Sequence, residues 1–478
     1  MRKEIRIRIK IRIWIRIRGQ KYLAPVRAWC ILGGMSEDFS AIEEKMQGVG
    51  LSRAAIDAFR HSVRVLTSNE SMLIAEDEIA PAEGVEDWDE LVAHTAPADA
   101  AMLKQTVVVK LNGGLGTSMG LQKAKSLLEI KPGVTFLDLI VRQVQSLRRQ
   151  ADCHVNLLLM DSFSTSDDTM AYLSRYAEDG FADRANVEML QNRVPKLTVD
   201  TLQPVEFPAN PDLEWCPPGH GDIYPALVGS GWLDKLLAAG VKYAFVSNSD
   251  NLGAQMDTRF LRWFAESGAP FVMEVTRRTE ADKKGGHLAT RKADGQPILR
   301  EVAQCPAADV PEFQDIDKHR FFNTNNLWIR LDALKEYLDA HGGVMPLPVI
   351  RNVKTVDPRD AATPKVYQLE TAMGAAIQCF AGARAVCVPR SRFFPVKTCS
   401  DLLLLRSDAV EIDADGRMAL APECGGVAPV VLLDSKLYKL VDSLDALGVP
   451  SLKNVKRLVV AKPHRFADAE PLQGCVEI

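Results

Sequence analysis

Apolar and polar stretches alternate along the middle of the chain in a way that predicts strands alternating with helices. Three short apolar runs have the length and composition of buried strands, at residues 107–110, 155–160 and 243–247. Residues 135–149 predict a helix, because Thr135 and Asp138 have the spacing of a capping box, and residues 167–176 predict another. This alternation predicts an α/β fold with a mostly parallel sheet and helices on both of its faces. Ligands of such sheets bind beyond the carboxyl ends of the strands.

The region before this alternation has a helical pattern. Residues 36–70 predict helix, with Ser52 as an N-cap and one apolar helical face formed by Ile56, Phe59, Val63 and Leu66. Residues 75–100 are acidic and contain prolines at positions 81 and 97, which indicates a connecting stretch.

The pattern changes again after about residue 390. Residues 401–406 and 435–447 predict helices, whereas residues 410–432 and 455–478 contain short strand-like apolar pieces between turns. We therefore expect four parts, namely an N-terminal extension, an N-terminal helical segment, a large α/β domain and a C-terminal domain, at residues 1–34, 35–100, 101–390 and 391–478.

The N-terminal extension is a simple repeat of isoleucine and basic residues. Its period of two describes an amphipathic strand with a cationic face, and it is too polar for the core of a signal peptide. It could be a membrane-surface strand, a basic targeting arm, or translated sequence upstream of the true start. Met35 is followed by Ser-Glu-Asp-Phe, an ordinary acidic N-terminus, so we favour a non-native or disordered extension.

Charge and cysteine content narrow the class of protein. The net charge of −4 becomes −13 without residues 1–34, which argues against a nucleic-acid partner. The nine cysteines form no Cys-x-x-Cys pair, so structural zinc and a disulfide framework are not expected, and scattered cysteines fit a reducing cytoplasm. Apolar runs long enough to span a membrane are absent from the sequence, so we expect no membrane partner.

A glycine-rich run follows the first predicted strand of the alternating region. Residues 111–120 read Leu-Asn-Gly-Gly-Leu-Gly-Thr-Ser-Met-Gly, with Lys123 and Lys125 shortly after. Glycines let the backbone turn sharply and point consecutive N–H groups at phosphate oxygens, and a lysine adds positive charge. The spacing is neither that of a Walker P-loop nor that of the dinucleotide fingerprint. The run predicts a phosphate-binding loop, with a tight structural turn as the alternative.

Five further segments have distinctive motifs of glycine, amide and charged residues. They are Trp-Cys-Pro-Pro-Gly-His-Gly-Asp-Ile-Tyr at 215–224, Val-Ser-Asn-Ser-Asp-Asn-Leu-Gly at 246–253, Phe-Asn-Thr-Asn-Asn-Leu-Trp at 322–328, Gln-Leu-Glu-Thr-Ala-Met-Gly-Ala-Ala at 368–376, and Phe-Pro-Val-Lys-Thr-Cys-Ser-Asp-Leu at 394–402. Together with the glycine loop, and in the same order, they resemble the eukaryotic-type UTP–glucose-1-phosphate uridylyltransferases, or UDP-glucose pyrophosphorylases. The resemblance extends from about residue 37 to the C-terminus.

The resemblance implies a fold and an activity. It implies a Rossmann-like, GT-A-like sheet in the catalytic domain at 101–390, and a small left-handed β-helix within 391–478. It implies an enzyme that makes UDP-glucose and pyrophosphate reversibly from UTP and glucose 1-phosphate with Mg²⁺. In relatives the β-helix can mediate homo-oligomer formation, and its short length here argues against an oligomer without excluding one. The alternatives are a pyrophosphorylase for another sugar and a nucleotide-sugar-binding protein without turnover.

The resemblance also implies roles for individual residues. Lys125 and Lys397 are the expected catalytic lysines, and Asp250 the expected Mg²⁺ ligand. The UTP site is implied to comprise Leu111, Asn112, Gly113, Gly114, Lys125, Gln191, Gly219, Asp250 and Lys397. The substrate site is implied to comprise Gly113, Gly114, His220, Asn248, Ser249, Asp250 and Asn325, with Asn323, Gly286 and Glu301 near the sugar.

Purely structural roles are the alternatives for three of these residues. Lys125 could be a solvated surface lysine, and Gln191 could be a loop glutamine bonded to backbone rather than to the uracil edge. Asp250 could form an Asx turn or cap a helix, which is common for aspartate after a strand.

Overall fold

The computed structural model describes residues 11–17, 20–26, 38–68 and 71–478, and the chain forms two units, residues 1–41 and 42–478. In the first unit, strand β1 (Ile11–Ile17) pairs antiparallel with β2 (Gln20–Val26). The strand predicted from the period-two repeat is therefore present over residues 11–17. The remainder of the predicted extension, and Met35, lie outside the described residues. Whether the extension is non-native stays a prediction.

The second unit begins with two helices rather than one. Helix α1 (Ser40–Gly48) and helix α2 (Arg53–Thr67) are separated by Gly50, which has a positive φ of 76°. The hydroxyl of Ser52 accepts a hydrogen bond from the Ala55 backbone N–H at 3.2 Å, which confirms the predicted N-cap. The predicted apolar face of α2 is buried at Ile56, Phe59 and Val63 and half-buried at Leu66.

Residues 75–100 are more than the connecting stretch that their composition indicated. They contain β3 (Ile79–Pro81), β4 (Glu86–Asp87) and α3 (Trp88–Ala93). Both strands pair with strands from the second half of the chain, so this segment is part of the central sheet. The segment at 35–100 that we expect to be helical therefore also contains two strands, which the sequence did not predict because strands of two or three residues are too short to give a periodic pattern.

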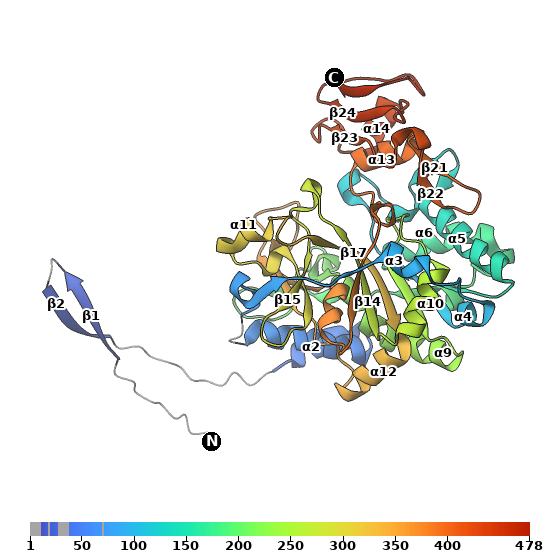
Figure 1. Ribbon diagram of the computed structural model, residues 1–478. Helices are drawn as coiled ribbons and strands as arrows, with labels where there is room; N and C mark the ends of the chain where they lie inside the picture. Colours follow the sequence, from blue (N-terminus) through green and yellow to red (C-terminus); the bar gives the residue numbers. More distant parts are fainter. Residues whose placement is uncertain (1–10, 18–19, 27–37, 69–70) are drawn as a thin grey trace. The chain divides into compact units, whose positions relative to one another are not determined.

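The centre of the second unit is a large sheet with the order β4-β20-β14-β17-β13-β5-β8-β9 (Figure 1). Its members beyond β4 are β20 (Arg384–Cys387), β14 (Phe271–Arg277), β17 (Phe321–Arg330), β13 (Tyr243–Asn248), β5 (Thr106–Leu111), β8 (Asn156–Asp161) and β9 (Glu188–Leu190). Neighbouring strands on this path are parallel except where β17 pairs antiparallel with β13 and β14. The predicted mostly parallel sheet is confirmed.

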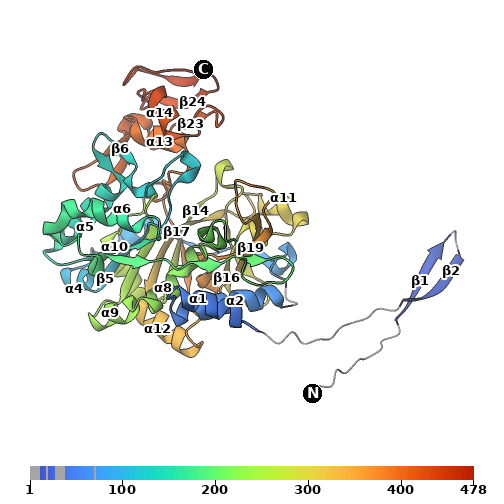
Figure 2. The ribbon, with the colours of Figure 1, turned by 180° about the vertical axis from the view of Figure 1, so that it is seen from behind.

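Strand residues alternate between two apolar cores, one on each face of the sheet. Val108, Leu157 and Phe245 pack in the core that includes α3, α5 (Phe136–Ala151) and α10 (Thr258–Ser267). Their neighbours Val107, Leu158 and Ala244 pack with α8 (Ile223–Gly229), α9 (Trp232–Ala238) and α12 (Leu331–Ala340). Figure 1 shows α3 in front of the sheet, and Figure 2, seen from behind, shows α8 there. Successive side chains of a strand point to opposite faces of the sheet. Because both faces are covered here, side chains that point to either face are buried, and the strands are continuous apolar runs.

Helix α5 begins at the predicted capping box. The Thr135 backbone N–H donates to Asp138 Oδ2 at 2.7 Å, and the Asp138 N–H donates to Thr135 Oγ1 at 3.2 Å. The second predicted helix is shorter than residues 167–176, since α6 (Ser166–Leu173) continues as a 3₁₀ helix from Ser174 to Asp179.

Smaller strands extend this framework. Strands β15 (His287–Arg291) and β16 (Pro297–Arg300) form an antiparallel pair joined to β17 and β3. A separate sheet has the order β11-β19-β18, formed by β11 (Leu197–Thr198), β19 (Lys365–Thr371) and β18 (Val349–Thr355).

The C-terminal part contains a second, small parallel sheet. Helix α13 (Cys399–Arg406) is followed by the antiparallel pair β21 (Val410–Ile412) and β22 (Met418–Leu420). The sheet has the order β23-β24-β25, formed by β23 (Val430–Leu433), β24 (Val455–Val460) and β25 (Gly474–Glu477). The helix predicted at 435–447 covers only α14 (Val441–Leu447), because residues 435–440 form turns.

Candidate active site

The glycine loop follows β5 directly, and two of its glycines are constrained by their surroundings or their backbone conformation. A Cβ on Gly113 would lie 2.8 Å from Gln191 Oε1, and Gly116 has a positive φ of 63°. The loop closes through a hydrogen bond from the Lys125 backbone N–H to the Gly114 carbonyl at 2.9 Å. Asn112 is buried, and its amide donates to Asp161 Oδ1 at 2.7 Å. The Asn112 backbone N–H donates to the Met160 carbonyl at 2.8 Å, and this predicted UTP-site residue does not line the cavity described next.

A cavity of about 320 Å³ lies at the carboxyl ends of β5, β8, β9 and β13. Its lining includes ten of the residues predicted from the sequence, which are Leu111, Gly113, Gly114, Lys125, Gln191, Gly219, His220, Asn248, Ser249 and Asp250. Larger cavities exist elsewhere, so its chemistry rather than its volume identifies this one as the candidate site. The expectation that the glycine loop and the segment after β13 meet in one crevice is confirmed.

Lys125 and Asp250 form an ion pair inside this cavity. Lys125 Nζ donates to Asp250 Oδ2 at 2.7 Å and also to the Val396 carbonyl oxygen. Both side chains are largely buried, with exposed fractions of 14% and 23%. Lys125 is thus not a solvated surface lysine, and the Asp250 carboxylate pairs with a cation rather than capping a helix.

Gln191 lies between the glycine loop and the Pro-Pro-Gly-His segment. Its backbone N–H donates to the Asp161 carbonyl at 2.7 Å, and its Nε2 donates to the Gly219 carbonyl at 3.1 Å. The backbone-bonded alternative therefore holds for the amide nitrogen, while Oε1 faces Gly113. Gly219 has a φ of 80°, and a Cβ there would lie 2.5 Å from the Thr371 carbonyl oxygen, so only glycine fits.

Asp222 holds the segment that follows Gln191 in place, although it was not predicted as a site residue. Its carboxylate accepts hydrogen bonds from the Asn192 backbone N–H at 2.7 Å and from Asn192 Nδ2. Burial raises the pKa of Asp222 to about 7. The acid in Gly-His-Gly-Asp was visible in the sequence, but its partner Asn192 lies 30 residues away.

His220 is held as a neutral hydrogen-bond donor. Its Nδ1 accepts from the Met373 backbone N–H at 3.0 Å, which places the ring proton on Nε2. Burial lowers the pKa of His220 to about 4, so the imidazole is uncharged near neutral pH. Since His220 lines the cavity, Nε2–H is available to an anionic or hydroxyl oxygen there.

Asn323 and Asn325, which were predicted near the sugar, lie at an irregularity in β17. The register of β17 against β14 shifts between Glu274 and Val275, and Asn325 at this bulge has a positive φ of 59°. Asn323 Nδ2 donates to Asn325 Oδ1 at 2.9 Å, and the Asn325 N–H donates to Asn323 Oδ1 at 3.0 Å. Bulges of this kind re-aim side chains beside functional sites. These two amides do not line the 320 Å³ cavity.

Gly286 and Glu301 form a second close contact on the sugar side. A Cβ on Gly286 would lie 2.5 Å from Glu301 Oε1, so the carboxylate lies directly against the glycine backbone. Burial raises the pKa of Glu301, and the charge of Lys397 opposes this rise. The Lys397 ammonium therefore interacts electrostatically with Glu301.

The segment that contains Lys397 folds back against the Asp250 loop, as its predicted role requires. The Val396 N–H donates to the Asp250 carbonyl at 3.1 Å, and Pro395 forms a β-bridge with Asn251. Lys397 itself is exposed and is not part of the cavity lining. Its backbone N–H donates to Asp401 Oδ2 at 2.9 Å at the start of α13.

Lys110 supports the Asp250 loop from beneath and was also missed. Its Nζ donates to Ser247 Oγ at 2.8 Å and to the Ala254 carbonyl at 2.7 Å. The side chain is buried, and burial lowers its pKa to about 7. A lysine directly after Val-Val-Val in a buried strand is a detectable anomaly, since lysine is almost never fully buried without partners.

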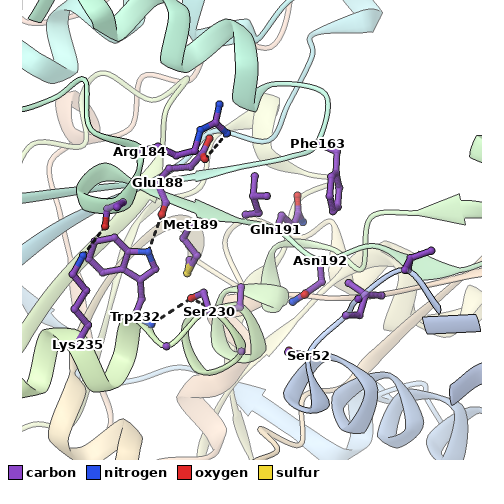
Figure 3. A pocket seen from close by; sticks show the side chains of 18 residues that line it. Ser52, Phe163, Arg184, Glu188, Met189, Gln191, Asn192, Ser230, Trp232 and Lys235 are labelled. Atoms are coloured by element: carbon purple, nitrogen blue, oxygen red, sulfur yellow. Dashed lines mark hydrogen bonds and ion pairs between the residues drawn. The ribbon is translucent and has the colours of Figure 1, made fainter. Parts of the chain in front are cut away.

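A second cavity of about 630 Å³ adjoins the first through Gln191 (Figure 3). Its lining includes Arg184, which forms an ion pair with Glu188 at 2.8 Å, and Trp232, whose Nε1 donates to the Glu188 carbonyl. Its basic groups are thus already paired with protein oxygens.

Among the described helices, none combines the length and apolarity needed to cross a membrane.

Comparisons with known proteins agree with this geometry. Residues 56–469 match the family model described as UTP–glucose-1-phosphate uridylyltransferase. The chain is 46% identical over 386 residues to the enzyme of that name from Saccharomyces cerevisiae, covering 80% of this chain and 75% of the yeast protein. It is 39% identical over 422 residues to the Solanum tuberosum enzyme of the same name, covering 87% and 83% of the two chains.

Solved structures give the same answer. A mutant UDP-glucose pyrophosphorylase from Leishmania major, in complex with UDP-glucose, has 49% sequence identity and a TM-score of 0.87, covering 93% of this chain and 94% of that one. Another mutant of the same enzyme has 50% identity and a TM-score of 0.85. The family match spans most of the chain, and the site predicted from the glycine loop is assembled in one cavity. The chain therefore belongs to the UTP–glucose-1-phosphate uridylyltransferase family.

Proposed function

We propose that this protein makes UDP-glucose and pyrophosphate reversibly from UTP and glucose 1-phosphate. One observation carries the proposal: a glycine loop, the amide of Gln191 and the Lys125–Asp250 ion pair converge in one cavity of a chain from this family. The loop suits phosphates, the amide suits a uracil edge, and the paired charges suit a reaction between two anions.

The proposed reaction is a direct displacement at phosphorus. An oxygen of the sugar phosphate attacks the α-phosphorus of UTP, and the bond from that phosphorus to the bridging oxygen breaks as pyrophosphate leaves. The protein contributes positioning and charge neutralisation, as in phosphoryl transfer generally. Lys125 and Lys397 would neutralise phosphate charge from two sides of the crevice, and His220 would donate from Nε2 to a substrate oxygen.

Asp250 is the residue that would hold Mg²⁺. Within the part of the chain that the structure describes, no three His, Cys, Asp or Glu side chains group into a metal site. Mg²⁺ is commonly held by one or two carboxylates together with substrate phosphates and waters, so a single carboxylate facing a phosphate-binding loop fits this ion. When bound, the ion would supply further neutralisation of phosphate charge.

The base is proposed to be uracil, and nucleotide competition tests it. Gln191 and the close backbone at Gly113 and Gly219 leave little room for a purine. UTP should be used at least about a hundredfold better than ATP or GTP, because a wrong base leaves buried polar groups unpaired. The measurement is kcat/KM for each nucleotide with glucose 1-phosphate, and comparable use of ATP would reduce the loop to a phosphate clamp.

A panel of sugar 1-phosphates tests the sugar. Pyrophosphate release with UTP should be fastest with glucose 1-phosphate. Faster release with another sugar would reassign the substrate. UTP binding without any pyrophosphate release would instead indicate a protein that binds nucleotide sugars without turnover.

We further propose that strands β23, β24 and β25 are the coils of a short left-handed β-helix. Their parallel order, with long returns between successive strands, supports this interpretation.

A monomer is the expected state because the stack is short, and size-exclusion chromatography with light scattering tests it. A cytoplasmic location is proposed on the cysteines, since the eight in the described part of the chain are all free thiols.

A further inference from the structure

We propose that Glu274 and Arg392 act as a positioning pair that sets the place of Lys397 relative to Asp250. The inference rests on the proposed function, because it concerns how two groups of that reaction are aligned. Neither Glu274 nor Arg392 lines the candidate cavity, so neither is placed to touch a substrate there.

Glu274 is a fixed carboxylate in the middle of the central sheet. Its side chain is fully buried on β14 and accepts from Arg392 through Nη2 at 2.6 Å and Nε at 3.0 Å. Trp328 Nε1 and Asn326 Nδ2, both on β17, donate to it at 2.8 and 2.9 Å. A buried carboxylate with four N–H donors in fixed directions has one orientation, and it imposes that orientation on the guanidinium.

Arg392 transfers this orientation to its own backbone. The guanidinium stacks 4.0 Å over the Trp88 ring, which restricts the side chain from its other face. The Arg392 carbonyl accepts from Asn251 Nδ2 at 3.2 Å, and Asn251 Oδ1 accepts from the Phe394 N–H at 2.8 Å. A Cβ on Gly253 would lie 2.3 Å from the Ser391 carbonyl oxygen, so the two backbones approach as closely as glycine allows.

The same segment then reaches both members of the catalytic ion pair. The Val396 N–H donates to the Asp250 carbonyl, and the Val396 carbonyl accepts from Lys125 Nζ. Lys397 is the next residue. A continuous series of contacts therefore links the buried Glu274 carboxylate in the sheet to Arg392 and then, along residues 392–396, to the predicted catalytic Lys397. A shift of about 1 Å in such a group can cost a hundredfold in rate.

Arg392→Met tests the proposal, with Arg390→Met as its matched control. We expect Arg392→Met to lower kcat by about tenfold to a hundredfold while changing the KM for UTP less than about threefold, because Gly113 and Gln191 stay in place. Arg390 lies in the same 3₁₀ turn and forms a similar two-bond ion pair with Asp282, but its partner lies outside the Asp250 loop. Arg390→Met should leave kcat within about threefold of wild type.

The double variant Glu274→Gln/Arg392→Met separates positioning from plain stability. Arg392→Met alone leaves a buried charge without its partner and should lower Tm, whereas removing both charges should restore much of it. We expect kcat to stay low in the double variant although Tm recovers. Recovery of kcat in parallel with Tm, or an equal loss of kcat in Arg390→Met, would overturn the proposal. Failure of the wild-type protein to form UDP-glucose would instead overturn the proposed function.

Discussion

Individual residues in this site are held by groups that the sequence does not place beside them. Lys125 and Asp250 were both predicted at the UTP site, as a catalytic lysine and as the Mg²⁺ ligand, and in the structure they form an ion pair at 2.7 Å. An anionic substrate or a cation must therefore compete with one member of the pair before the other is released. Each charged side chain therefore holds the other in its orientation.

Asp250→Asn should nearly abolish activity for this reason. The variant keeps the side-chain shape but loses the charge that would hold Mg²⁺ and that pairs with Lys125. We expect kcat/KM to fall by about a hundredfold to a thousandfold, the usual cost of one preorganised electrostatic group. UDP-glucose formation measured across a Mg²⁺ titration checks this, and wild-type rates at low Mg²⁺ would refute the assignment.

Asp222 should make the stability of the protein depend on pH. Its folded pKa of about 7 lies above the unfolded value near 4, so the folded state binds the extra proton between these values. The stabilisation is full below about pH 4 and is lost as the pH rises through about 7. Asp222→Asn should therefore flatten the decline of Tm between about pH 4 and pH 7. The dependence should persist in part, because burial also raises the pKa of Asp161 to about 7.

An unchanged slope in the Asp222→Asn melting curves would show that this carboxyl is ionised throughout the range. Asp161→Asn, measured over the same pH values, provides the comparison.

At the scale of elements, regular strands and capped helices could be predicted and local irregularities could not. The apolar runs after residues 106, 155 and 242 are long enough to be recognised as strands. The capping-box residues Thr135 and Asp138 mark the start of α5. The bulge at Asn325 depends on pairing between β14 and β17, which sequence periodicity does not encode. The same limit explains why β3 and β4 were missed, since their partners lie about two hundred residues away or more.

Candidate site residues followed the same division. Many of those in contiguous motifs, such as Gly113 and His220, line the cavity, whereas Asn325 and Lys397 do not. Asp222, Lys110 and Glu274 act through partners far away in the sequence, so their roles become clear only in the folded chain.

Lys397 should act through the element that carries it. The segment before α13 lies against the Asp250 loop, so an ammonium at its end can neutralise charge that develops as pyrophosphate leaves. Lys397→Ala should lower kcat by about a hundredfold to a thousandfold, with a smaller effect on glucose 1-phosphate binding. Lys397→Arg should recover little, because a planar fork does not replace a compact charge. A change in kcat below about threefold would make Lys397 an ordinary exposed residue.

At the scale of the whole molecule, one crevice is built from segments spread between residues 111 and 250. The glycine loop, Gln191, the Pro-Pro-Gly-His segment and the Asp250 loop converge at the carboxyl ends of parallel strands. This is the location expected for ligands of such sheets, and it explains how motifs separated by a hundred residues or more serve one site. The candidate residues all lie within residues 42–478, and the family match begins at residue 56.

Residues 1–34 should therefore be dispensable. A shortened chain that begins at Met35 should keep the Tm and the kcat/KM of the full chain, because it retains every candidate residue and every core residue from Phe39 onward. A chain that begins at Leu51 is the control, since it loses the buried side chains of Ile42 and Met46 in α1. Each such side chain stabilises by about 1.5–3 kcal/mol, so this second chain should melt at a lower temperature. If removing residues 1–34 alone lowered Tm or activity, the basic repeat would be a working part of the native protein.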